Sequence, residues 1–176
     1  LGAAHVPGVS RLIHEDRDVE PLEQLPPKSV VPKIIGWAIP AVIVGLLVLS
    51  FVMNPSIGVQ QTLSWVLWTG CLSALGAALA FAHPVAIVAG FLAAPFTALH
   101  PLLAAGWFAG IAQAYFQRPQ VRDFEALSED VLSLKGFWRN RVTRVLLVVV
   151  LSNIGTSIGT FVGGADLLRN FIGLFR

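Results

Sequence analysis

Two histidines in an apolar stretch are the first residues of this sequence whose type and spacing could do chemistry. His83 and His100 lie seventeen residues apart, and each is followed directly by a proline, Pro84 or Pro101. A membrane-embedded metal or proton site could use such imidazoles, but zinc takes about four ligands and transport sites usually pair ionisable groups. The stretch between the two histidines holds no charged residue. We therefore favour an architectural role, in which each His-Pro step is a hinge of a helical hairpin.

A third histidine, His5, follows Gly2, Ala3 and Ala4. A histidine after a small-residue turn at a strand end can present a metal ligand or an acid-base group at the rim of a site. Short Gly-x-x-His patterns also arise by chance. From the pattern alone we favour a histidine without a chemical role.

The composition indicates an all-α integral membrane protein. Of the 176 residues, 55% are hydrophobic and 12% charged, whereas about a quarter of residues are charged in soluble domains. Residues 34–117 contain no Asp, Glu, Lys or Arg. The net charge of +2 comes from basic residues beside apolar spans, which predicts contact with membrane lipid and not with nucleic acid. The single cysteine, Cys71, can form no internal disulfide.

The chain divides into three parts by composition. Residues 1–17 are expected to be the remnant of an upstream soluble domain, with a strand end, a turn and a short helix. Residues 18–33 read as a proline-rich linker, and residues 34–176 as a helical membrane domain. The opening residues lack the features of a signal peptide, so we expect the chain to be the downstream part of a longer protein.

Three full transmembrane helices are predicted, at about 34–53, 62–82 and 145–164, each long enough to cross a hydrocarbon core of about 30 Å. Residues 84–116 instead form two helices of about 24 Å each, at roughly 1.5 Å per residue. They predict a short hairpin that either crosses a thin membrane or re-enters it. Both alternatives return the chain to the side it left.

Residues 121–138 predict an amphipathic interfacial helix. Its apolar stripe consists of Phe124, Leu127, Val131, Leu134 and Trp138. The closing segment from Ala165 is also amphipathic, and we expect it to lie on the far membrane surface.

The basic residues predict the orientation. The densest cluster is Arg118, Arg122, Lys135, Arg139, Arg141 and Arg144. By the positive-inside rule, the 118–144 loop and the N-terminus are cytoplasmic, and the C-terminus lies outside.

The last predicted span carries a small-residue stripe. Gly155, Gly159 and Gly163 recur every four residues, with Thr156 and Thr160 beside them. Such spacing lets two helix backbones approach closely in lipid. The partner is either a second copy of the chain, giving a homo-oligomer, or another span of the same chain, which we favour.

Several stretches together resemble one family. They are "GAAHVPGV", "PKIIGWAIP", "TLSALGAALAFAHP", the long segment from Val121 to Gly164 and the closing "ADLLR". In combination they resemble the C-terminal part of the TraB/PrgY family of pheromone-shutdown membrane proteins of prokaryotic cell membranes. The resemblance implies an N-terminal domain similar to the TIKI proteases, in which paired Gly-x-x-His motifs are taken to bind a divalent metal.

Gly2 and His5 match the second of those motifs, so the resemblance implies that His5 is a metal ligand in the full-length protein. No complete catalytic site and no cofactor are expected in this chain alone. The implied function is to anchor, and to oligomerise, a metal-dependent peptidase-like domain that inhibits a peptide signal. A secreted peptide suggests the outer face, whereas the charges place the N-terminus inside, and both alternatives stay open. The alternative function is a small transporter or channel-like module built on the His83/His100 hairpin.

Overall fold

A computed structural model describes residues 2–13 and 30–173 of the chain. The chain divides into two compact units, residues 1–32 and residues 33–176. In the first unit, a single-turn helix η1 (Ala3–His5) leads into α1 (Val6–Leu12). The strand end expected here is wrong for residues 2–13, which are helical apart from their ends. Residues 14–29, which include most of the predicted linker, lie outside the described residues.

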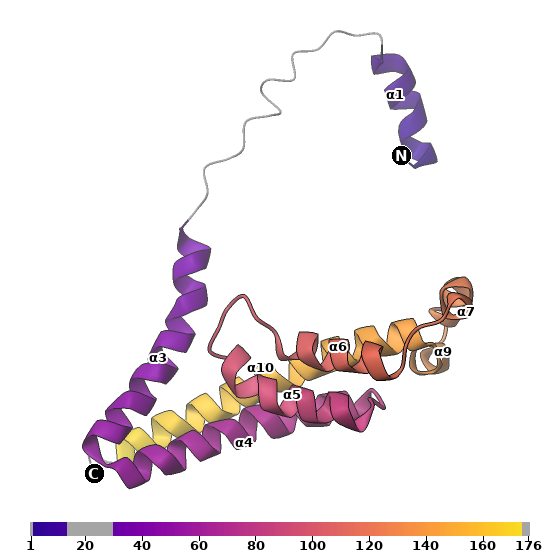
Figure 1. Cartoon of the computed structure of the whole chain (residues 1–176). Coiled ribbons are helices and arrows are strands. Elements are labelled where there is room, and N and C mark those ends of the chain that lie inside the picture. Colours follow the sequence, from indigo (N-terminus) through magenta and orange to yellow (C-terminus); the bar gives the residue numbers. More distant parts are fainter. Residues whose placement is uncertain (1, 14–29, 174–176) are drawn as a thin grey trace. The chain divides into compact units, whose positions relative to one another are not determined.

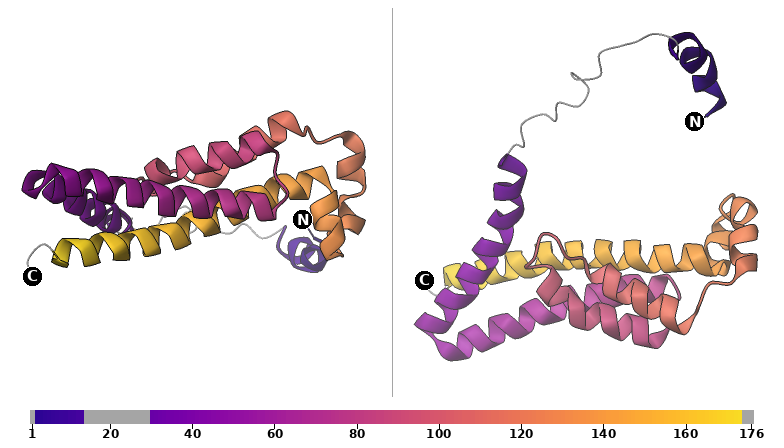
Figure 2. Two further views of the ribbon diagram at one scale, coloured as in Figure 1. Left: turned by 90° about the horizontal axis from the view of Figure 1, so that it is seen from below. Right: turned by 45° about the horizontal axis from the view of Figure 1, so that its top comes forward.

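Within residues 2–13 and 30–173, three helices are long and apolar enough to cross a membrane, as predicted. They are α3 (Val31–Met53), α4 (Pro55–Leu79) and α10 (Arg141–Gly173). Helices α4 and α10 lie side by side. Helix α3 is joined to α4 at Asn54 and points away from α4 (Figures 1 and 2). Ile43 of α3 packs with Trp65 of α4 and Leu167 of α10, which joins the three helices in one apolar cluster.

Two of the long helices extend beyond the predicted spans. The segment expected to connect the first two spans is instead the start of α4, because the Asn54 side chain accepts a hydrogen bond from the Ser56 N–H (3.1 Å) and Pro55 takes the first helical position. At the other end, α10 continues unbroken to Gly173, so the expected surface helix is wrong. Asp166, which accepts from Ser64 Oγ at 2.5 Å, and the buried Leu167 hold this extension against α4 and its neighbours.

The predicted hairpin consists of α5 (Pro84–Thr97) and α6 (Ala105–Phe116). It leaves the end of α4, reaches only part of the way along α4 and α10, and returns to the same end (Figures 1 and 2). The indole N–H of Trp65 donates to the carbonyl of Pro95 (3.3 Å), so the hairpin tip at residues 98–104 lies near the middle of the long helices. At roughly 1.5 Å per residue, neither short helix matches the length of α4.

The predicted helix at 121–138 is three short helices: α7 (Val121–Glu125), α8 (Leu127–Asp130) and α9 (Leu134–Arg139). The chain turns back because Ser133 Oγ caps α9 by accepting from the Gly136 N–H (3.0 Å), and Gly136 packs directly on the backbone of Asp130, where a Cβ would overlap it. The expected apolar stripe is therefore not one face of one helix.

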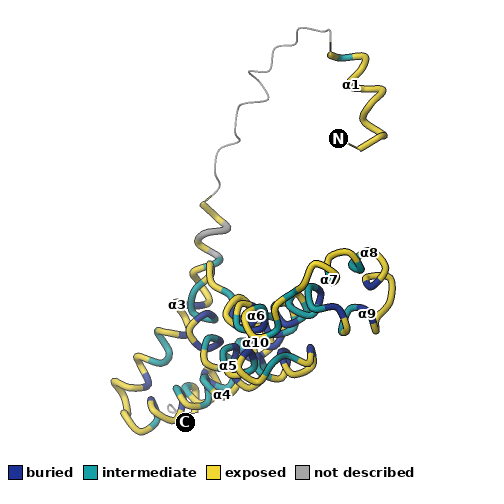
Figure 3. Tube along the Cα trace, turned by 45° about the vertical axis from the view of Figure 1, so that its right-hand side comes forward, coloured by how far each residue is buried: buried dark blue, intermediate teal, exposed yellow. Residues whose placement is uncertain are grey.

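Polar side chains fill much of the interior, while large apolar side chains cover the outside. The fully or nearly fully buried polar residues include Ser50, Gln61, Thr69, Ser73, Gln113, Thr143 and Ser152. The exposed apolar residues include Leu63, Leu67, Leu75, Leu92, Ile111, Ile154 and Phe161. Figure 3 shows the buried positions where the helices face one another and the exposed positions on their outer sides.

Candidate functional site

His83 is built into the start of the hairpin. Its Nδ1 accepts a hydrogen bond from the Val85 N–H (3.3 Å), which caps α5, and its ring stacks on Phe116 with centroids 4.7 Å apart. Its backbone N–H donates to Oε1 of the buried Gln113 (2.7 Å). Pro84 then occupies the first helical position. Residues of the hairpin thus contact the imidazole at Nδ1, through a hydrogen bond, and on one face of the ring, through stacking.

His100 has the same local arrangement at the hairpin tip. Its Nδ1 accepts from the Leu102 N–H (3.3 Å), and its ring meets Trp37 of α3 edge to face, 5.4 Å between centroids. Pro101 follows in an exposed turn that leads to α6. In the neutral ring the hydrogen therefore lies on Nε2, which remains a donor. The hairpin keeps the two histidines at its opposite ends, so they share no site.

The glycines of α10 lie against α4 of the same chain. A Cβ on Gly155 would overlap the carbonyl oxygen of Leu72, and one on Gly159 would lie 2.6 Å from that of Trp68. A Cβ on Gly163 would lie 3.2 Å from the Trp65 ring. Thr156 and Thr160 donate their hydroxyls to carbonyls one turn back, at 2.9 and 2.8 Å. In this chain the stripe therefore packs two of its own helices together.

The hairpin docks against the same pair of helices through further small residues. Gly90 of α5 lies near Ser73, Ala109 and Ser152, one from each of the other three packed helices. On α6, Gly106 contacts the backbone of Val149, and its N–H donates to Asn153 Oδ1 (2.8 Å). Asn153 thus holds the hairpin tip to α10 by a hydrogen bond between side chain and backbone.

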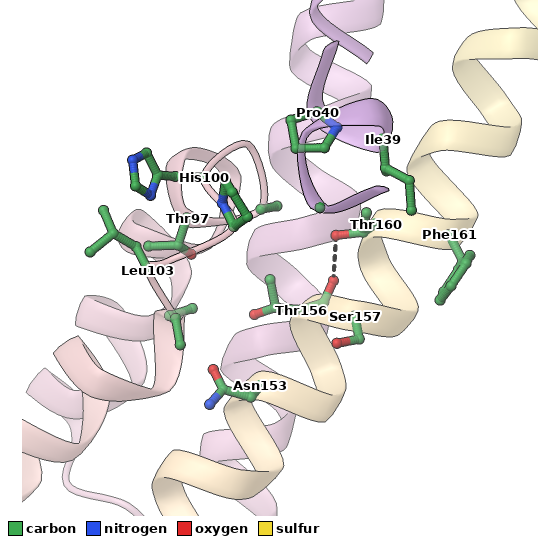
Figure 4. Close-up of a pocket in the computed structure, with 15 residues that line it drawn as sticks. Ile39, Pro40, Thr97, His100, Leu103, Asn153, Thr156, Ser157, Thr160 and Phe161 are labelled. Atoms are coloured by element: carbon green, nitrogen blue, oxygen red, sulfur yellow. Dashed lines mark hydrogen bonds between the residues drawn. The ribbon is translucent and has the colours of Figure 1, made fainter. Parts of the chain in front are cut away.

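A cavity of about 350 Å³ lies where α3, the hairpin tip and α10 meet (Figure 4). Its lining includes Gly36 and Pro40 from α3, Thr97 and His100 from the hairpin, and Asn153, Thr156, Ser157 and Thr160 from α10. Pro40 has no N–H to bond the Gly36 carbonyl, so that carbonyl lacks its helical partner beside the cavity. A cavity with several polar groups in a mostly apolar wall thus lies midway along apolar helices.

The chemistry of this cavity suits a neutral polar ligand. Asn153 keeps both amide N–H donors, because only its Oδ1 is bonded among the described residues. Hydroxyls of Thr97, Ser157 and Thr160 add acceptors. Among the described residues that line the cavity, none is an Asp, Glu, Lys or Arg. It can therefore exchange hydrogen bonds but offers no carboxylate for acid-base work or for a cation.

A second polar network, at the base of the hairpin, was not anticipated from the sequence. Gln113 Nε2 donates to Gln117 Oε1 (3.0 Å), which also accepts from Arg144 (3.2 Å). Arg144 further donates through Nε to the carbonyl of Trp138 (2.7 Å), and the Trp138 indole donates to the carbonyl of Leu79 (2.9 Å). The spacing of Gln113 and Gln117, one helical turn apart in an uncharged segment, is the signal that could have revealed it.

Asp130 organises the loop before α10, a role that was not predicted from the sequence. Asp130 is 8% exposed and accepts from Asn140 Nδ2 (3.0 Å) and Arg139 (2.7 Å). The hydrogen bond from Asn140, and then that from Arg139, hold the pKa of Asp130 below its ordinary value. Asn140 also donates to the Asp123 carbonyl (2.6 Å), which ties α7 to the start of α10.

His5 belongs to the first unit, residues 1–32. It closes η1, and its Nδ1 would lie 3.6 Å from a Cβ on Gly2, so the two motif residues are adjacent. Within residues 2–13 and 30–173, no three His, Cys, Asp or Glu side chains gather as metal ligands would. The metal role of His5 stays a prediction.

The comparisons with known proteins agree with the sequence resemblance. Residues 31–172 match the family described as "TraB family protein, C-terminal domain". Over 172 residues the chain is 32% identical to Uncharacterized protein MJ1365 of Methanocaldococcus jannaschii, an alignment that covers 92% of this chain and 43% of that protein. The chain thus spans less than half the length of this relative. No solved structure matches it. Since the family match covers the hairpin and all three long helices, the chain belongs to the TraB family and contains its C-terminal domain.

Proposed function

We propose that this chain is the membrane anchor of a TraB family protein and holds an upstream soluble domain at the surface of a prokaryotic cell membrane. The observation that carries the proposal is the distribution of polarity: Ser73 and Ser152 are fully buried between helices, while Phe161 is 74% exposed. Water would disfavour that arrangement, whereas lipid covers apolar side chains and leaves small and polar residues to pack helices together.

In this proposal α3, α4 and α10 cross the bilayer, and the α5–α6 hairpin re-enters it from the side of the 118–144 loop. Its support is the length of the hairpin: Pro95 and Gly106, on either side of its tip, bond to Trp65 and Asn153 partway along the long helices. The basic residues of the loop favour its cytoplasmic placement, and the three short helices α7 to α9 then lie at the membrane surface.

The upstream part would carry the chemistry. The resemblance to pheromone-shutdown proteins supports a metal-dependent peptidase-like domain that inhibits a peptide signal, with His5 as one ligand of a divalent metal. The remaining ligands would come from a part of the full-length protein that this chain does not cover, since the aligned region is 43% of the relative.

Self-association remains part of the proposal, but through another surface than the glycine stripe. Gly155 and Gly159 already face α4 within the chain, and neither has room for a further backbone. A homo-oligomer would therefore form through an outer apolar face.

Two measurements test the anchor. Alkaline extraction of membranes should leave the chain in the pellet, and release into the supernatant would contradict membrane insertion. With the upstream domain present, mass spectrometry of a peptide substrate should show cleavage that needs a divalent metal and is lost in His5→Ala. Insertion without metal-dependent cleavage would keep the anchor and remove the peptidase.

One observation favours a second candidate, a transporter or channel-like module: the polar groups that line part of the cavity at the hairpin tip. Its donors and acceptors suit a small neutral solute rather than an ion. The purified chain in liposomes should then carry solute faster than empty liposomes, and Asn153→Ala and His100→Ala should change that rate. A rate equal to that of empty liposomes would reject this candidate.

A further inference from the structure

The ends of α6 and α10 enclose a second cleft, of about 450 Å³, that is positively charged. Its lining consists of Tyr115, Phe116, Gln117, Arg118, Arg141 and Arg144, and none of these described residues is acidic. We propose that this cleft binds the phosphate of an anionic phospholipid headgroup. The proposal rests on the membrane insertion inferred above.

The three guanidinium groups are held in place by neutral acceptors, not by carboxylates. Arg144 uses three of its five N–H groups on the Trp138 carbonyl and on Gln117 Oε1, which leaves two. Arg141 donates to the Arg118 carbonyl (3.1 Å). Arg118 lies over the Tyr115 ring, 5.4 Å from its centroid. Among the described residues, no carboxylate therefore compensates their positive charge within the cleft.

Two of the four carboxylates of the adjoining loop are bound elsewhere, and the other two, Glu125 and Glu129, do not line the cleft. Asp123 accepts from the Gln120 N–H (2.7 Å) at the start of α7. Asp130 is paired with Arg139 and Asn140. A planar guanidinium presents two parallel N–H groups, which fit the oxygens of a phosphate better than a lysine does. The cleft thus has the charge and donor geometry for a phosphate anion.

An apolar track leads away from the cleft along α6. Trp107, Ile111 and Tyr115 recur every four residues, and their exposed fractions are 51%, 70% and 64%. They form one outward stripe that covers about 12 Å at 1.5 Å per residue. A lipid whose headgroup lies in the cleft would lay an acyl chain along this stripe. That continuity favours a phospholipid over a soluble phosphate compound.

The position of the cleft agrees with a headgroup. Residues 34–117 are uncharged, and after Arg144 the next charged residue is Asp166. Arg118, Arg141 and Arg144 therefore stand where the apolar segments of α6 and α10 meet the polar loop. Tyrosine, here Tyr115, is also enriched at that depth.

The test is a lipid titration of the purified 176-residue chain in neutral detergent, followed by native mass spectrometry. Phosphatidylglycerol is compared with phosphatidylcholine for the unaltered chain, for Arg118→Gln/Arg141→Gln and for Arg122→Gln/Lys135→Gln. The second double variant removes the same charge from the same loop but leaves the cleft intact. Arg144 is kept because its hydrogen bonds join α6, α9 and α10.

The unaltered chain should prefer phosphatidylglycerol, and the cleft variant should lose roughly tenfold or more of that affinity. The control variant should retain it. Equal losses in both variants would show a diffuse charge effect and overturn the site, as would the absence of any preference for phosphatidylglycerol. Displacement of the lipid by millimolar inorganic phosphate would overturn the lipid assignment in favour of a soluble anion. Alkaline extraction of the same proteins distinguishes a failure of this site from a failure of membrane insertion.

Discussion

At the scale of single residues, the two hairpin histidines accept backbone hydrogen bonds: His83 caps α5, and His100 closes the turn that precedes α6. Each Nδ1 accepts a backbone N–H two residues further on, from Val85 or Leu102. This use explains why each histidine precedes a proline: the pair sets the extended backbone before the helix or turn and supplies its first acceptor.

We expect His83→Ala to lower the unfolding free energy by about 1 kcal/mol, because the Val85 N–H loses its acceptor. His83→Asn should restore much of that loss, since asparagine caps well. The measurement is the midpoint of thermal unfolding in detergent, followed by near-ultraviolet circular dichroism. If both variants lose the same stability, the stacking on Phe116 and not the cap is what matters.

Asp130 gives the 118–144 loop a dependence on pH. Its pKa is lowered in the folded chain, so its contribution to stability is present above the unfolded pKa, about 3.9 for Asp, and is lost as pH falls through the folded value. Hydrogen exchange of residues 121–140 should therefore quicken below about pH 4 by more than the intrinsic rate explains.

Asp130→Asn should show fast exchange at neutral pH already, because Arg139 loses its ion pair. The exposed neighbour Glu129 supplies the control, and Glu129→Gln should keep the acid dependence. Unchanged exchange in Asp130→Asn would mean that Asn140 and Ser133 alone hold the loop.

At the scale of helices, the α4–α10 pair depends on positions without a side chain. Gly155→Leu or Gly159→Leu would drive carbon atoms into the backbone of Leu72, Trp68 or Thr69, which cannot yield as a side chain can. We expect a loss of about 3 kcal/mol or a failure to fold. The readout is the unfolding midpoint together with the monodispersity of the detergent-solubilised chain.

The control is in the same helix. Nothing lies within 4 Å of a Cβ on Gly164, so Gly164→Ala should raise stability by about 0.5 to 1 kcal/mol through helix propensity. A Gly159→Leu chain that folds normally but changes its oligomeric mass would instead place the glycine stripe between copies.

Helix type and order could be predicted from the sequence, while several helix ends could not. An uncharged run of more than eighty residues leaves few alternatives to membrane helices. The proline that begins α5 and the residue that caps this helix are also visible in the sequence. The extension of α4 to Pro55 and of α10 to Gly173 depends on contacts such as Ser64 with Asp166, which lie 102 residues apart. The fold of residues 121–140 depends on the hydrogen bond that Asn140 donates to Asp130. Periodicity over one segment contains no information on such pairs.

The candidate sites divide in the same way. Asn153 and the histidines are evident in the sequence because they are polar residues in apolar surroundings. The cavity at the hairpin tip needs Pro40, Thr97 and Asn153 from three separate helices, and the arginine cleft needs Arg118 beside Arg141. Both are products of tertiary packing, so only the structure locates them.

At the scale of the whole molecule, the depth of the hairpin decides the topology. Single cysteines can be placed, after Cys71→Ala, at Leu132 in the loop, at Asn170 near the end of α10 and at Leu102 in the hairpin tip, all exposed positions. In intact cells a membrane-impermeant maleimide should label Asn170→Cys, and it should reach Leu132→Cys only after the membrane is opened. Leu102→Cys should stay unlabelled in both conditions, because a hairpin of 14 and 12 helical residues reaches only about 20 Å into a core of about 30 Å.

Labelling of Leu102→Cys from the Asn170 side would mean that the hairpin crosses a thinned membrane. Labelling of Leu132→Cys in intact cells would invert the molecule and place the upstream domain on the outer face, where a secreted peptide could reach it.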